Sequence, residues 1–259
     1  MGAAIKALSD TGTLLRHNPV IVLLGALSMA VLAVVNFVLG LIPLVGTLVS
    51  LFVYPAFIAG LLSLIYAGRD GRADASDFTD GLGEHYLRML GAYGLLAVPS
   101  VVLIVVAVAV TVTVGLTATE PGSAASASSA TPMLLVFALV GLAVAVGYLG
   151  LQFFNVAIVS GAGVLESFST SLSLAASAPL STLGFTILKT GLGAVMLGLP
   201  LAVLVVTGAG LSELTAGSNP LAGGVLVLGL LAYWLVGIPL WRVVSNTYHV
   251  AYFNRRQFA

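Results

Sequence analysis

Apolar residues follow one another in six long stretches along the chain, and short polar segments separate these stretches. The hydrocarbon core of a bilayer is about 30 Å thick, so a helix that crosses it needs about 20 apolar residues. Stretches of this length lie at about residues 19–42, 45–67, 88–115, 132–160, 183–211 and 221–244. The pattern therefore predicts an all-α integral membrane protein with six transmembrane helices.

Three of the predicted helices share a start signal, a polar residue followed by proline: Asn18-Pro19, Thr131-Pro132 and Asn219-Pro220. A short polar side chain at the N-cap pairs with free backbone N–H groups, and proline at the first helical position has no N–H to pair. We expect helices to begin at these prolines.

Residues 1–18 show helical periodicity without the length of a span. Apolar and polar side chains fall on opposite faces: Ile5, Leu8 and Leu15 against Lys6, Asp10 and His17. Lys6 and Asp10 stand four residues apart and could pair. The pattern predicts an amphipathic helix in the membrane interface, with a leader outside the membrane as the alternative. Residues 19–250 then form the six-helix membrane domain, and residues 251–259 a cytoplasmic tail.

Composition supports a lipid environment. Charged residues make up 7 % of the chain and hydrophobic residues 59 %, whereas soluble domains have about 25 % charged residues. The net charge is zero, which gives no electrostatic basis for binding nucleic acid. The chain has no cysteine, which excludes disulfides, thiol catalysis and Cys-ligated zinc.

The basic residues predict the orientation, because cytoplasmic loops of membrane proteins are enriched in Lys and Arg. With a cytoplasmic N-terminus and six crossings, every basic residue lies on the inner side, and the outer loops carry only Glu120 and Glu213. We therefore expect a multi-pass protein of the cell membrane with both termini in the cytoplasm.

Two inner links differ in charge. The first, "RDGRADASDFTDGLGEHYLR" at 69–88, holds eight of the eighteen charged residues. In it we expect Asp77 to cap a short helix whose apolar face, with Phe78 and Leu82, lies on the membrane. The second link has helical spacing in Leu165 and Phe168 and predicts an amphipathic interfacial helix.

Two parts of the sequence also resemble each other. A shift of 101 positions superimposes residues 52–105 on 153–206 without a gap. The matched pairs are Gly60 with Gly161, Leu82-Gly83 with Leu183-Gly184, Arg88 with Lys189, and Pro99 with Pro200. Spans two and three therefore look like a copy of spans four and five, in a parallel internal repeat about an axis along the membrane normal.

Three segments together resemble a known group: "FFNVAIVSGAGVLESFSTSLSLA", then "LGFTILKT", then "NTYHVAYFNRR". They are similar to archaeal and bacterial six-span membrane proteins of unknown function, which in turn resemble the membrane domain of glycerophosphoryl diester phosphodiesterases. The resemblance implies a six-helix bundle with interfacial helices. The phosphodiesterase domain is absent, and no catalytic residue carries over. The abundance of Ala, Val, Gly and Asp suggests an archaeal source.

Polar side chains inside the spans are costly and hence informative. Intramembrane polar contacts are expected for Asn36, Gln152, Asn155 and Asn246. Arg88, Lys189 and His249 lie near the inner boundary, and the repeat places the two bases at equivalent positions. We hypothesise a shallow basic pocket there that holds an anionic headgroup. The alternative is that the two bases only snorkel to the interface.

No catalytic, cofactor or metal site follows from the sequence. The carboxylates of the first link could hold a hard cation, but their spacing does not fit an EF-hand, and a solvated acidic loop is the simpler interpretation. We therefore expect a protein that is not an enzyme: a scaffold, an accessory subunit of other membrane proteins, or an anionic-lipid-binding protein whose partner is membrane lipid. The alternative is a permease, or a permease subunit, for a small molecule that passes between the two repeats.

Overall fold

A computed structural model describes residues 2–42, 45–117, 127–198, 200–202 and 220–257. These residues form helices joined by short connections, with no strand among them. Six helical segments are long and apolar enough to cross a membrane: Pro19–Gly40, Val45–Asp70, Ala75–Leu103, Phe137–Val159, Pro179–Ala202 and Val227–Gln257. The predicted all-α architecture with six spans is confirmed. Glu120 and Glu213, assigned to the outer loops, lie outside the described residues.

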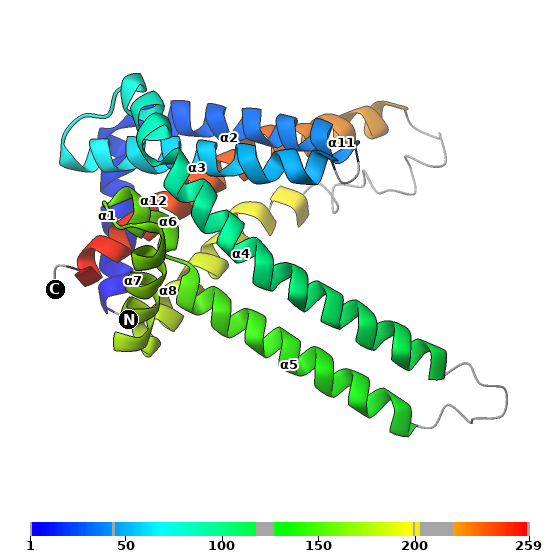
Figure 1. The fold of residues 1–259 in the computed structure, drawn as a ribbon. Helices are drawn as coiled ribbons and strands as arrows, with labels where there is room; N and C mark the ends of the chain where they lie inside the picture. Colours follow the sequence, from blue (N-terminus) through cyan, green and yellow to red (C-terminus); the bar gives the residue numbers. More distant parts are fainter. Residues whose placement is uncertain (1, 43–44, 118–126, 199, 203–219, 258–259) are drawn as a thin grey trace.

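The helices are α1 (Gly2–His17), α2 (Pro19–Gly40), α3 (Val45–Asp70), α4 (Ala75–Thr117), α5 (Ala127–Leu151), α6 (Phe154–Val159), α7 (Val164–Ser177), α8 (Pro179–Gly193), the π-helix η1 (Ala194–Gly198), α11 (Pro220–Ala232), the π-helix η2 (Tyr233–Gly237) and α12 (Ile238–Gln257). Long helices run side by side, and α1 and α7 cross their ends (Figure 1). Both chain ends lie at that same end of the molecule, as an even number of crossings requires.

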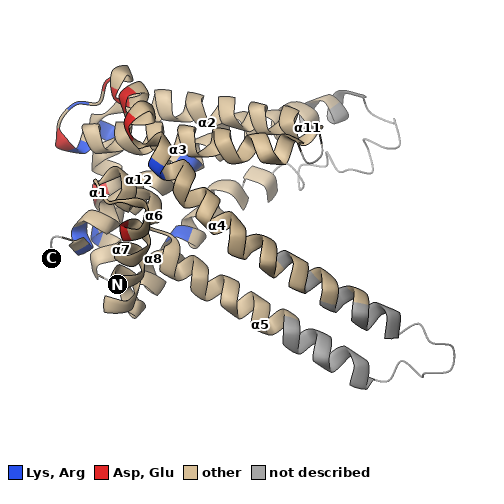
Figure 2. Ribbon diagram, in the orientation of Figure 1, with Lys and Arg blue, Asp and Glu red and all other residues tan. Residues whose placement is uncertain are grey.

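The charged residues gather at the end where α1, α7 and both chain ends lie, here called the charged end (Figure 2). The described far parts of α2, α4, α5 and α11 carry no Asp, Glu, Lys or Arg. Because charge is expensive in hydrocarbon, this asymmetry indicates which end of the helices meets water.

Helix α1 exists as expected, but it packs on protein through its small residues. Ala4, Ala7 and Thr11 are buried, while Ile5 on the other side is 57 % exposed. The Tyr248 hydroxyl of α12 donates a hydrogen bond to the Ala4 carbonyl at 3.1 Å. Asp10 does not pair with Lys6; its carboxylate accepts a two-pronged bond from the Arg255 guanidinium, with one contact at 2.8 Å. This ion pair ties α1 to the last turn of α12.

The start signals hold for two helices of three. Helix α2 begins at Pro19 and α11 at Pro220, whereas α5 begins at Ala127, ahead of Pro132. The Asn18 side chain does not cap α2. Its Nδ2 donates to the Gly68 carbonyl at 3.0 Å, and its Oδ1 accepts the Ala73 N–H at 3.3 Å. Asn18 therefore fixes the corner between α1 and α2 against the end of α3.

The charged link is shorter than expected. Helix α3 runs to Asp70 and α4 starts at Ala75, so most of the acidic segment is the first part of a continuous 43-residue helix. Asp77 acts from inside this helix, where its carboxylate accepts the Asp74 N–H at 2.7 Å. Phe78 packs on α3 rather than on lipid, with its ring 6.3 Å from that of Phe57. The face predicted to lie on the membrane is therefore a helix–helix contact.

A break interrupts the fourth span between Leu151 and Phe154. Backbone groups freed inside a membrane need new partners. Ser171 of α7 supplies them, because its hydroxyl donates to the Gly150 carbonyl at 2.6 Å and accepts the Phe153 N–H at 3.1 Å. Leu165 and Leu172, on another face of α7, are 73 % and 50 % exposed, which fits the predicted interfacial helix.

The structure of residues 153–206 does not match that of residues 52–105 at every position of the gapless alignment. Gly60 is buried inside α3, whereas Gly161 lies in a turn with φ of 109°. Residues 82–99 and 183–198 are helical in both copies. The structure thus matches the register in its second half only, and the repeat as a whole stays a prediction.

The last helix is longer than its predicted span. Residues 251–257, expected as a tail, are the final turns of α12, and Tyr252 and Phe253 are fully buried there. Their rings belong to an aromatic cluster at the charged end with Phe153, Phe185 and Tyr248. This cluster joins the break before α6, through Phe153, to α8 and α12.

Candidate functional site: a buried lysine and an acidic cavity

Lys189, near the end of α8, is the one Lys, Arg, Asp or Glu residue that is buried in the described part of the chain. It is 7 % exposed, and in the described part of the chain no carboxylate lies within ion-pair distance of it. Its Nζ lies 5.8 Å from the centre of the Phe185 ring, a cation–π distance. An ionisable group buried without a counter-charge in a membrane helix is a candidate functional residue.

Two side chains from other helices meet the Lys189 ammonium group. It donates to the hydroxyl oxygen of Tyr148 on α5, and it lies 3.3 Å from Nε2 of His249 on α12. The other ring nitrogen, Nδ1, is 2.7 Å from the Ser245 carbonyl and must donate to it. In a neutral ring Nε2 then accepts from Lys189.

The ammonium group has three N–H donors, and these contacts use two. Among the described residues no third acceptor lies within hydrogen-bond distance. Tyr148 accepts from Lys189, so its own O–H is free to donate, and this residue is 50 % exposed. The O–H of Tyr148 on α5 and the third N–H of Lys189 on α8 therefore remain to donate to an anion that approaches between these helices.

Further polar contacts join neighbouring helices. Gln152, at the break after α5, donates to Thr186 Oγ1 of α8 at 3.1 Å. Asn155 of α6 donates to the Tyr93 hydroxyl of α4 at 2.9 Å. On α12, Arg242 donates to the Tyr54 hydroxyl of α3 at 3.1 Å. Gln152, Asn155 and Arg242 thus have interhelical partners, as expected for polar groups in spans.

The predicted site residues divide into two groups. Lys189 and His249 come together, and Gln152 and Asn155 make interhelical contacts. Arg88 is exposed on α4 and close enough to His85 to affect it electrostatically; it makes no hydrogen bond to the Lys189 group.

The other two predicted polar residues make no interhelical hydrogen bond in the described part of the chain. Asn246 donates to the Arg242 carbonyl of its own helix at 2.8 Å. Asn36 leaves its Oδ1 buried without a hydrogen-bond partner there.

Three tyrosines that pair with these polar side chains were not predicted from the sequence. Tyr148, Tyr54 and Tyr93 supply the hydroxyls that meet Lys189, Arg242 and Asn155. A tyrosine in an apolar run carries no charge signal, although its hydroxyl needs a partner when buried. Each of these tyrosines places a hydroxyl within an apolar stretch, and that feature could have predicted a polar contact there.

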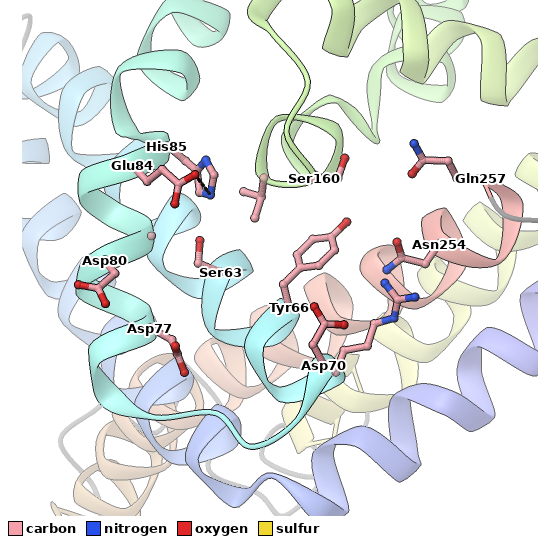
Figure 3. Close-up of a pocket in the computed structure, with 13 residues that line it drawn as sticks. Ser63, Tyr66, Asp70, Asp77, Asp80, Glu84, His85, Ser160, Asn254 and Gln257 are labelled. Carbon is pink, nitrogen blue, oxygen red and sulfur yellow. Dashed lines mark ion pairs between the residues drawn. The ribbon is translucent and has the colours of Figure 1, made fainter.

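A second feature lies at the charged end, a cavity of about 470 Å³ between α3, α4, the end of α6 and the last turns of α12, here called the acidic cavity. Its charged lining residues are Arg69, Asp70, Asp77, Asp80 and Glu84, and its neutral polar ones Ser63, Tyr66, His85, Ser160, Asn254 and Gln257. Figure 3 shows Glu84 and His85 on one wall, Asn254 and Gln257 on the opposite one, and Tyr66 between them. The described residues contain no group of three His, Asp or Glu side chains that could hold a metal ion.

A second cavity, of about 560 Å³, lies under α1 and is lined by residues of α1, the end of α3 and α12. Asp10 and Arg255, which form the ion pair, both line it. Neither cavity is lined by residues of the far halves of the spans.

The family described as a domain of unknown function, DUF7847, matches residues 3–256. The chain belongs to the DUF7847 family. No curated protein and no solved structure shows significant similarity to the chain. The expected membership of an uncharacterised family is therefore established, while the similarity to the membrane domain of glycerophosphoryl diester phosphodiesterases is not shown. The Lys189 cluster, which consists of Lys189, Tyr148 and His249, falls within the matched residues of this DUF7847 chain, and so do all lining residues of the acidic cavity except Gln257.

Proposed function

We propose that this protein binds anionic lipid in the membrane, with the lipid phosphate accepting hydrogen bonds from Lys189 and Tyr148. The observation that carries the proposal is the buried Lys189 ammonium group, which has a free donor and no carboxylate partner among the described residues. A phosphate supplies both the missing charge and the missing acceptors. His249 positions the ammonium group by accepting one of its N–H bonds.

The surroundings suit a lipid. The acyl chains would lie along α4 and α5, whose far halves expose apolar side chains such as Val102, Leu139 and Leu142. In Figure 1 these halves diverge from α2 and α3. The headgroup site involves Lys189 without Arg88, which revises the two-base pocket expected from the repeat.

A role in organising lipid, or as an accessory subunit that holds lipid for other membrane proteins, follows from such binding. The cell membrane with cytoplasmic termini is the setting we propose, because all basic residues fall on one side of the six spans. A permease is the alternative. It would need a polar path along the spans, whereas the two described cavities stay at the charged end.

The test is retention of anionic lipid. The full chain is placed in nanodiscs of mixed phosphatidylglycerol and phosphatidylcholine, released, and examined by native mass spectrometry. Lys189→Gln should lower the bound phosphatidylglycerol at least fivefold, and Tyr148→Phe about twofold. Lys6→Gln removes an equal charge from exposed α1 and should change nothing.

Two further variants sharpen the result. Arg88→Gln should retain the lipid, since Arg88 lies outside the Lys189 contacts, and Lys189→Arg should retain part of it because the charge remains. Unchanged retention in a folded Lys189→Gln protein would reject the proposal. Loss of lipid in Lys6→Gln to the same extent would mean that only the net charge matters.

A further inference from the structure

The acidic cavity carries an excess of negative charge. Four carboxylates and one guanidinium line it, and Arg88 stands near one wall. Asp77 is engaged by the Asp74 N–H, and Figure 3 shows Asp80 turned away from the centre. Asp70 and Glu84 remain, from the end of α3 and from α4, without an ion pair to Arg69 among the described residues. The four lining carboxylates outnumber the guanidinium of Arg69, and Asp70 and Glu84 stand on different walls without an ion pair to it.

Buried polar atoms of the same cavity have no hydrogen-bond partner. His85 and Asn254 are 6 % and 5 % exposed, and Nδ1 of His85 and Nδ2 of Asn254 are unpaired, as is Oγ of Ser63. The Tyr66 hydroxyl lies near Asn254 and Ser160 but outside hydrogen-bond geometry. Buried polar groups are almost always paired with protein, water or ligand. Side chains more than nine-tenths buried and aimed into a cavity thus indicate an occupant with hydrogen-bonding groups.

The lining favours N–H donors on that occupant. Nε2 of His85 lies 3.9 Å from the Glu84 carboxylate, which is beyond hydrogen-bond distance. In the neutral ring that carries its proton on Nε2, the nitrogen nearer the carboxylate, Nδ1 is an acceptor. Ser63 Oγ and the Tyr66 hydroxyl also accept. Nδ2 of Asn254 is a donor, and it lies near the Tyr66 hydroxyl rather than requiring a group on the occupant. The three acceptors, with the carboxylates of Asp70 and Glu84, match a cation that carries several N–H bonds, while the described residues offer no three-residue set for a metal ion.

We propose that the acidic cavity binds a small organic cation with primary ammonium groups. One ammonium lies between Glu84, His85 and Ser63, and a second positive group lies toward Asp70 and the ring of Tyr66. The volume of about 470 Å³ suits a small metabolite. This site is separate from the Lys189 cluster and needs no lipid.

The test uses putrescine as the probe. Isothermal titration calorimetry is done on the full chain in nanodiscs of phosphatidylcholine alone, with empty nanodiscs subtracted. Putrescine should bind, and the double variant Asp70→Asn, Glu84→Gln should bind at least tenfold more weakly. Asp74→Asn is the matched control, because it removes a carboxylate beside the cavity and keeps an N-cap side chain; its affinity should stay within twofold.

The bis(trimethylammonium) analogue of putrescine separates hydrogen bonding from charge, since it keeps both positive charges and the four-carbon spacer but has no N–H donor. It should bind at least tenfold more weakly than putrescine. If the double variant does not fold, the single variant Asp70→Asn, at an exposed position, should weaken binding about threefold. The proposal is overturned if putrescine gives no heat above empty nanodiscs, if the carboxylate variants bind as tightly as the native chain, or if the bis(trimethylammonium) analogue binds as tightly as putrescine.

Discussion

Helix α3 and helix α4 have similar apolar sequences and very different surroundings. In the apolar window of α3, 44 % of the residues are buried within the protein, against 11 % in that of α4. From residue 93 to 149, no described residue is buried. Lipid is as apolar as leucine, so apolar side chains alone do not bring membrane helices together. Hydropathy therefore indicates which segments enter the bilayer but not which of them pack.

The surroundings of the glycines explain why some helices pack closely and others do not. A Cβ on Gly25 would lie 2.9 Å from Leu61 and Val243, and one on Gly68 would lie 2.5 Å from Ile21. These contacts join α2, α3 and α12. Gly94 and Gly141, in α4 and α5, have open space around the same position. The same residue type is a packing site in one region and a neutral helix position in the other.

The strongest test of this contrast is Gly81→Ala on α4. The added Cβ would lie 2.1 Å from the Ser63 Cβ of α3, and overpacking of this kind costs about 1–3 kcal/mol. Gly83→Ala, two residues away with nothing nearby, should stabilise by up to about 1 kcal/mol, because alanine is the better helix former. Equilibrium unfolding in mixed detergent micelles measures both.

The double variant Gly81→Ala, Ser63→Gly should recover most of the lost stability, because glycine at 63 removes the clashing atom. If Gly81→Ala and Gly83→Ala behave alike, α3 and α4 do not approach each other as closely as described.

An effect of similar size is expected from Ser171→Ala. The change leaves the Gly150 carbonyl and the Phe153 N–H without their partner at the break in the fourth span, and buried unpaired groups cost about 1–3 kcal/mol. Ser173→Ala removes only a bond within its own helix, to Thr170, and should be close to neutral. Hydrogen exchange at residues 150–153 should rise in the first variant alone; equal exchange in both would contradict the bridging role.

The ion pair of Asp10 and Arg255 should contribute less still. Both side chains are partly exposed, at 44 % and 38 %, and salt screens such pairs. In a cycle of Asp10→Asn, Arg255→Gln and the double variant, the melting temperatures should show a small coupling at low salt that disappears at high salt. A coupling that persists at high salt would mean that the pair is buried in the membrane-bound protein.

Several parts of this structure follow from sequence, and the reasons that others do not are physical. The six spans and the starts at Pro19 and Pro220 depend on apolar length and on local backbone chemistry, which a single chain displays. The first link was expected to be a separate short helix because its charges look like a loop. Helix α4 nevertheless continues through it, because Gly60 and Gly81 leave room for α4 to pack on α3.

The candidate site shows the same limit. Lys189 and His249 are visible in the sequence because charge is rare in this chain, and their polarity led to the expected headgroup site. Tyr148 completes the cluster from 41 positions away, and no local pattern relates it to Lys189. Arg88 was predicted as a site residue because it aligns with Lys189 in the repeat. It lies outside the Lys189 cluster, because the two aligned segments pack on different neighbours.

The smallest effect is expected for Leu142→Ala in the exposed half of α5, and Leu61→Ala, at a buried position of α3, serves as its reference. Leu142 is 61 % exposed whereas Leu61 of α3 is fully buried. Leu61→Ala should cost about 2–5 kcal/mol through the cavity that it leaves, while Leu142→Ala should change the unfolding free energy by less than about 0.5 kcal/mol, as surface changes usually do. Equilibrium unfolding of both variants in the same micelles gives the comparison. A large loss at Leu142 in the micelles would mean that this face of α5 packs against protein there, either another part of the chain or a second copy, and is not exposed to lipid or detergent.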